Sequence, residues 1–171
     1  KIDLTSTLGI PSIYEVDINS IRDESGKIVQ QVFWYGDEDG KIYFPMFLNS
    51  FSNKEWKITP NKEWVEINSL KGNVWIYANR PLDNDANLDD SAQVHLNNYL
   101  AENKLHPSVV VHRGHSYWLP GTIRRMAGDA KIVVLGSCGG YKNLNDIIDI
   151  NPDAHIISTK EIGAGEINRP I

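Results

Sequence analysis

The sequence predicts an α/β fold, in which a mostly parallel sheet is flanked by helices and preceded by a β-rich segment. Three observations favour it. Short apolar runs occur at residues 74–78, 108–112, 131–135 and 154–158. Helix-type segments separate these runs, and strands that are apolar on both faces are typical of a parallel sheet covered by helices. The preceding residues are instead rich in β-branched and aromatic side chains. We therefore expect a β-rich segment at residues 1–72 and an α/β domain at residues 73–171.

The N-terminal segment predicts short strands joined by turns. Residues 27–35 and 41–47 are expected to be strands, and the sequence Gly-Asp-Glu-Asp-Gly between them has the composition of a hairpin turn. The tetrapeptide Asn-Lys-Glu-Trp then occurs twice, ending at Trp56 and at Trp64. We interpret the two copies as two short strands or one hairpin, with both tryptophans on a shared face.

The second part alternates strands with helices. A helix is predicted at residues 88–103, and shorter helices at residues 120–128 and 144–150. The buried face of the first helix is expected to contain Val94, Leu96, Tyr99 and Leu100.

Composition and charge exclude several classes of protein. Of 171 residues, 17 are basic and 22 acidic, so the net charge is −5 at pH 7. A nucleic-acid-binding domain normally carries a basic excess, so we expect no nucleic-acid partner. A single cysteine excludes an internal disulfide and a zinc site built from several cysteines. No apolar run reaches 18 residues, which predicts no membrane span.

The first residue is Lys1, so we expect the chain to be part of a longer protein. Two compartments are compatible with the sequence: the cytoplasm, or the outside of the cell after removal of a signal peptide.

Two predicted strands end in residues that carry chemistry. The strand at residues 108–112 continues into Gly114, His115 and Ser116, and the strand at residues 131–135 continues into Cys138 and Gly139. Parallel neighbours would bring both loops to one edge of the sheet. An imidazole beside a thiol can take its proton, and the thiolate then attacks a carbonyl.

The backbone N–H group of Gly114 or Ser116, together with that of Cys138, would hold the oxyanion. The alternative interpretation is that Cys138 is a small core residue.

These two blocks, VVVHRGHSYW and KIVVLGSCGG, resemble the His and Cys blocks of the caspase-like (clan CD) cysteine peptidases. The separation of 23 residues between His115 and Cys138 is most similar to that of the compact separase and CHAT members. The resemblance implies a caspase-like α/β fold and a cysteine endopeptidase that needs no cofactor. It implies that Cys138 is the nucleophile and His115 the general base. The glycine precedes His115 here, whereas most members have His-Gly, and His112 is expected to be a buried structural residue. Compared with the usual core of the family, one strand-helix unit is missing between residues 78 and 109. Either the sheet is small, or strands of the N-terminal segment join it.

The resemblance also points to a substrate pocket. The loop after the strand at residues 154–158 corresponds to one that shapes specificity in the family, which implies roles for Thr159, Glu161 and Glu166. The implied partner is a peptide or protein substrate. A basic substrate residue is expected to be bound by the carboxylate of Asp85, Asp89, Glu161 or Glu166.

Three other interpretations stay open or are set aside. The chain would be a catalytically inactive caspase-like interaction module if Cys138 faces away from the histidines. The sequence Gly-Ser-Cys-Gly-Gly also fits the nucleophile turn of amidotransferase-like hydrolases, but the histidine downstream of it, His155, begins a strand. The acidic stretch at residues 83–89 lacks the glycine and the glutamate of a calcium loop, so we expect no metal there.

Overall fold

The computed structural model describes residue 7 and residues 15–162. Its strands are β1 (Ile28–Trp34), β2 (Trp56–Pro60), β3 (Trp64–Ser69), β4 (Val74–Asn79), β5 (Val109–Arg113), β6 (Ile132–Leu135) and β7 (His155–Ser158). Its helices are α2 (Glu38–Asn49), α3 (Leu88–Glu102), α4 (Leu119–Arg125) and α5 (Leu144–Ile150), with 3₁₀ turns η1 (Ser116–Trp118) and η2 (Gly140–Asn143).

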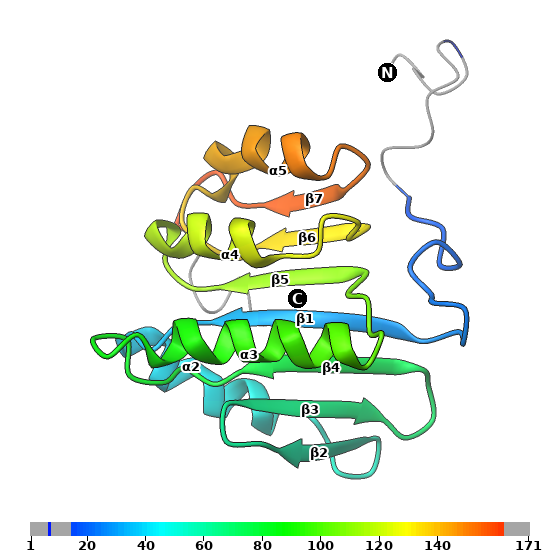
Figure 1. Cartoon of the computed structure of the whole chain (residues 1–171). Helices are drawn as coiled ribbons and strands as arrows, with labels where there is room; N and C mark the ends of the chain where they lie inside the picture. Colours follow the sequence, from blue (N-terminus) through cyan, green and yellow to red (C-terminus); the bar gives the residue numbers. More distant parts are fainter. Residues whose placement is uncertain (1–6, 8–14, 163–171) are drawn as a thin grey trace.

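The strands form one sheet in the order β2-β3-β4-β1-β5-β6-β7 (Figure 1). Strands β4, β1, β5, β6 and β7 are parallel, and β3 and β2 extend the sheet in antiparallel pairing. A mixed α/β fold with a mostly parallel sheet is therefore confirmed. The N-terminal strand β1 lies between β4 and β5, so the second of the two expected arrangements holds: the N-terminal segment supplies strands to the sheet.

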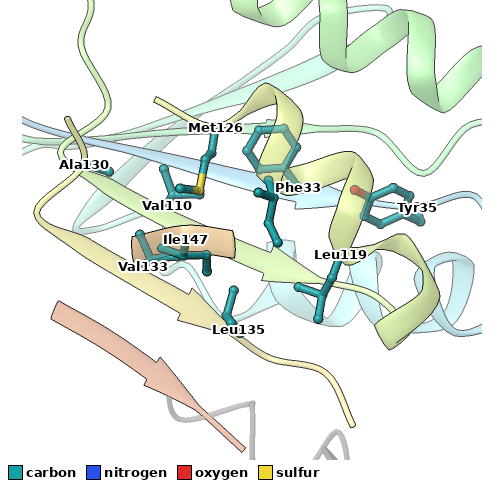
Figure 2. Packing of buried hydrophobic residues seen from close by; sticks show 10 residues of the cluster. Phe33, Tyr35, Val110, Leu119, Met126, Ala130, Val133, Leu135 and Ile147 are labelled. Atoms are coloured by element: carbon teal, nitrogen blue, oxygen red, sulfur yellow. The ribbon is translucent and has the colours of Figure 1, made fainter. Parts of the chain in front are cut away.

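Helices cover both faces of the sheet. Helices α3, α4 and α5 lie on one face, and α2 lies on the other, behind the sheet in Figure 1. The layers follow the alternation of side chains along β1, where Phe33 packs towards α4 and its neighbours Val32 and Trp34 pack towards α2. Figure 2 shows the α4 side, where Leu119 and Met126 rest on the strands beside Ile147 of α5.

The prediction of a strand at residues 41–47 is wrong, because this stretch belongs to helix α2. The Asp37 side chain accepts a hydrogen bond from the Gly40 N–H at 2.8 Å and so caps the helix. The apolar side chains of Phe44 and Phe47 follow at helical spacing and contact Trp34, with ring centroids 5.4 and 5.5 Å apart. The expected hairpin turn is therefore a helix N-terminus.

Two smaller expectations also fail. Strands β2 and β3 do form a hairpin, but Trp56 and Trp64 lie on opposite faces, since Trp56 packs with the α2 core and Trp64 with Tyr99 of α3. The helix at residues 88–103 is confirmed as α3, with Leu96 and Leu100 buried. Val94 is 44% exposed, however, and Gln93 occupies the buried face beside Leu96.

Candidate active site

The candidate site lies at the carboxyl ends of β5 and β6, which are parallel neighbours as predicted. His112 is in register with Leu135, and the Gly136 N–H donates to the His112 carbonyl at 3.2 Å. His115 lies three residues beyond His112, and Cys138 lies three residues beyond Leu135. Adjacent strands are about 4.8 Å apart, so the two loops leave the same edge of the sheet side by side.

Cys138 is a free, exposed cysteine. It is therefore not the small core residue of the alternative interpretation. Gly139 follows it in the left-handed region, at φ 61°, which glycine adopts without strain and which turns the chain into η2. The thiol is thus presented to solvent on a tight turn between a buried strand and a 3₁₀ turn.

The segment after β7 holds this turn in place. The Gly139 N–H donates to the Glu161 carbonyl at 2.9 Å, and the Tyr141 N–H donates to the Thr159 carbonyl at 3.2 Å. The Thr159 hydroxyl donates to the Ser137 carbonyl. Thr159 and Glu161 therefore lie beside the cysteine turn, while Glu166 falls outside the described residues.

His115 lies on the surface of the neighbouring loop with its side chain 42% exposed. Its Nε2 is 3.4 Å from Oδ2 of Asp39, in the first turn of α2, and its ring stacks on Tyr117 with centroids 5.2 Å apart. Among the described residues, no hydrogen bond joins Cys138 to His115 or to His112. The structure thus places the two residues in adjacent loops and holds the imidazole against a carboxylate.

His112 is fully buried, as predicted, and shapes the loop from behind. Its Nε2 donates to the carbonyls of Gly114 at 3.1 Å and His115 at 3.3 Å. The other ring nitrogen is 2.7 Å from the Thr122 hydroxyl, which is itself 2.7 Å from the Tyr35 hydroxyl. Burial lowers the pKa of His112 to about 4. Both ring nitrogens already have hydrogen-bond partners and the side chain is buried, so His115 rather than His112 is available as a base.

The loop residues flanking His115 differ in environment. A methyl group at Gly114 would lie 2.6 Å from Cδ2 of Tyr35, so the chain passes the Tyr35 ring closely there. Ser116 is exposed and begins η1. Trp118, at the end of η1, stacks on Tyr35 at 5.0 Å and donates to Asp37 at 2.9 Å.

Of the acidic residues expected to bind a basic substrate residue, Glu161 lies beside the cysteine turn, whereas Asp85 precedes α3 and Asp89 lies in its first turn. Asp89 is buried, and its carboxylate accepts hydrogen bonds from the N–H groups of Gly36 at 3.0 Å and Asp90 at 2.7 Å. That prediction is wrong for Asp89, which supports the end of β1. Asp85 is exposed in the loop before α3.

One residue at this edge, Asp39, is missing from the predicted site, because a hairpin turn is expected where the structure has the first turn of α2.

Two further interpretations concern His155 and a metal site. His155 begins β7 and so lies at the opposite end of the sheet from Cys138, as the interpretation against an amidotransferase-like site expects. Within the described ranges, no three His, Cys, Asp or Glu side chains gather in a way that would hold a metal ion. The same part of the chain contains no helix with the length and apolarity to cross a bilayer.

Comparison of the chain with protein-family models, with curated proteins and with solved structures found no match.

Proposed function

We propose that this chain is a caspase-like cysteine endopeptidase, with Cys138 as the nucleophile and His115 as the general base. The observation that carries the proposal is the pairing of β5 with β6, which sets an exposed thiol and a half-exposed imidazole in neighbouring loops. A thiol and an imidazole at the carboxyl ends of adjacent parallel strands are the two groups that acyl transfer needs.

In the proposed reaction, His115 takes the thiol proton and the Cys138 thiolate attacks the substrate carbonyl. The peptide C–N bond breaks, the protonated His115 gives its proton to the leaving amine, and water then hydrolyses the thioester. Asp39 faces Nε2 of His115, so Nδ1 is the ring nitrogen left for the thiol proton. A carboxylate in this position orients the base, as the third member of a catalytic triad does.

Backbone N–H groups at the cysteine turn would stabilise the oxyanion. The expected donors are those of Cys138 and of Gly114 or Ser116, which belong to the two loops. The backbone hydrogen bonds from Gly139 and Tyr141 to the segment after β7 keep the cysteine turn rigid, as an oxyanion site requires.

The test combines thiol labelling with substrate turnover. Iodoacetamide at neutral pH, followed by mass spectrometry, should modify Cys138 quickly in the wild type and more slowly in His115→Ala. A peptide panel with Arg, Lys, Asp or Asn before the scissile bond should be cleaved by the wild type and not by Cys138→Ala or His115→Ala. Slow labelling that does not respond to His115→Ala, with no cleavage, would favour a catalytically inactive module.

A further inference from the structure

Helix α2 carries apolar side chains on the side that it turns to solvent. Ile42, Tyr43 and Met46 are exposed, whereas Phe44 is buried against the sheet. A surface helix normally places polar side chains on its solvent side. Exposed apolar side chains that lie together, unlike single ones, are typical of interaction surfaces.

Helical spacing connects these side chains to the candidate general base. Oδ2 of Asp39, in the first turn of α2, lies 3.4 Å from Nε2 of His115. Tyr43 follows Asp39 by four residues and Met46 follows it by seven, so both share a side of the helix with Asp39. Because the rise is about 1.5 Å per residue, Met46 lies about 10 Å from Asp39 along the helix axis.

Tyr117 extends this surface on the other side of His115. Its side chain is exposed, and its ring stacks on the imidazole of His115 with centroids 5.2 Å apart. Burial, together with the nearby carboxylates of Asp37 and Asp39, raises the pKa of its hydroxyl, which places Tyr117 beside the first turn of α2. We call the exposed apolar side chains around the His115–Asp39 contact the apolar strip; they are Tyr117, Ile42, Tyr43 and Met46.

The proposed reaction determines which part of a substrate would meet the apolar strip. When the peptide bond breaks, the acyl part stays on Cys138, and the leaving amine takes a proton from His115. The leaving part of the substrate therefore starts beside His115. An extended peptide advances about 3.4 Å per residue, so four residues reach about as far as Met46 lies from Asp39.

We propose that the apolar strip binds the part of the substrate that follows the scissile bond and selects apolar side chains within its first four residues. Contact with Tyr43 and Met46 would remove apolar surface of both partners from water, which stabilises the complex. The unbranched side chain of Met46 can adapt to apolar groups of different shape. The substrate preference rests on the proposed peptidase function, whereas the binding of an apolar peptide by the strip does not.

Binding is tested on Cys138→Ala, which excludes any covalent step, with the tetrapeptide amides Gly-Leu-Phe-Leu and Gly-Ser-Asn-Ser. The chain contains two methionines, the exposed Met46 and the buried Met126, so methionine labelled with ¹³C at its methyl group gives two NMR signals. The apolar peptide should shift the signal of Met46, while that of Met126 serves as an internal reference. The polar peptide should shift neither signal at the same concentration.

Variants of the strip measure its contribution to affinity. Tyr43→Ser and Met46→Ser should each raise the calorimetric Kd of the apolar peptide about five-fold, because roughly half of each side chain remains to be buried. Ile148→Ser is the matched control, since Ile148 is 46% exposed and Met46 is 50% exposed. Ile148 belongs to α5 on the opposite face of the sheet (Figure 1), so the Kd should stay unchanged.

Three outcomes would overturn the binding surface. They are an unshifted Met46 signal at saturating apolar peptide, equal affinity for the polar peptide, and an equal rise of the Kd in Ile148→Ser. The NMR measurement keeps the native strip and therefore remains decisive if a serine variant does not fold.

A cleavage assay separates this inference from the proposed function. Peptides that differ only after the scissile bond, with Leu or Ser at the second and fourth residues, should show a higher kcat/KM for Leu. The double variant Tyr43→Ser with Met46→Ser should remove that preference. Cleavage without a preference for Leu would overturn the substrate assignment and leave the peptidase standing. Binding at Met46 without any cleavage would overturn the peptidase and leave the binding surface standing.

Discussion

Acidification should destabilise this protein through His112, over a pH window that the structure defines. The ring is fully buried, and burial lowers its pKa from 6.5 to about 4. The unfolded chain takes up a proton as the pH falls through 6.5, whereas the folded chain does so only near pH 4. The stabilisation from the neutral ring is therefore complete above pH 6.5 and is lost progressively down to pH 4.

The size of the effect follows from the two pKa values. Each pKa unit corresponds to about 1.4 kcal/mol, so the full loss for His112 is about 3 kcal/mol, of which most is reached by pH 4.5. The free energy of unfolding of a domain is typically about 5–15 kcal/mol, so a loss of about 3 kcal/mol is a large share of it. The effect should be visible in ordinary urea unfolding curves.

The assay compares urea unfolding of the wild type and of His112→Gln at several pH values between 7.5 and 4.5. Other titrating groups contribute equally to both proteins, so the difference between their free energies of unfolding isolates His112. The variant should be less stable at pH 7.5, because an amide replaces the ring that binds Thr122 and two carbonyls, but the gap should narrow by about 2–3 kcal/mol at pH 4.5.

The reasoning is refuted if the free energies of unfolding of the wild type and of His112→Gln change in parallel between pH 7.5 and 4.5. If His112→Gln does not fold, NMR titration of the wild-type imidazole gives the same answer directly. A ring resonance of His112 that titrates near pH 6.5 in the folded protein would show that burial does not hold it neutral.

Three further predictions concern stability. A methyl group at Gly36 would lie 1.5 Å from the Leu82 carbonyl oxygen, so Gly36→Ala should cost several kcal/mol or prevent folding. A methyl group at Gly128 would lie 3.7 Å from Cγ2 of Ile150, an ordinary van der Waals contact, so Gly128→Ala should fold normally by circular dichroism. Ile147→Ala should lower the free energy of unfolding in urea by about 2–5 kcal/mol, because the side chain is fully buried between α5 and the sheet. Asp37→Ala removes the cap of α2 and the partner of an indole N–H, and should cost about 1–2 kcal/mol by thermal and urea unfolding.

The strands of the second half could be read from the sequence because each is an uninterrupted apolar run bounded by polar residues. Helix α2 could not, because the turn-like sequence before it has the same composition as a helix N-terminus. The deciding signal was the spacing of Phe44, Phe47 and Phe51, which suits a helix better than a strand. Phe44 and Phe47 contact the ring of Trp34, and Phe51 contacts the ring of Trp56. The three phenylalanine side chains therefore face the sheet.

Some features of the candidate site could likewise be predicted from the sequence, and others could not. The neighbouring loops of His115 and Cys138 were predictable, because parallel strands end at the same edge whatever covers them. The insertion of β1 between β4 and β5 was not, because strand order depends on packing across the whole chain. Asp39 reaches His115 only through that insertion, and no local pattern of the sequence encodes this contact.

The geometry of the site depends on two separate supports. The backbone that carries His115 is held by a neutral buried imidazole, through the carbonyls of residues 114 and 115, whereas Asp39 holds the ring itself. The cysteine turn is held by the segment after β7. Among the described residues, no hydrogen bond joins the thiol of Cys138 to the imidazole of His115, so each loop is held by its own support. In the proposed reaction, the remaining adjustment would be rotation of these two solvent-exposed side chains.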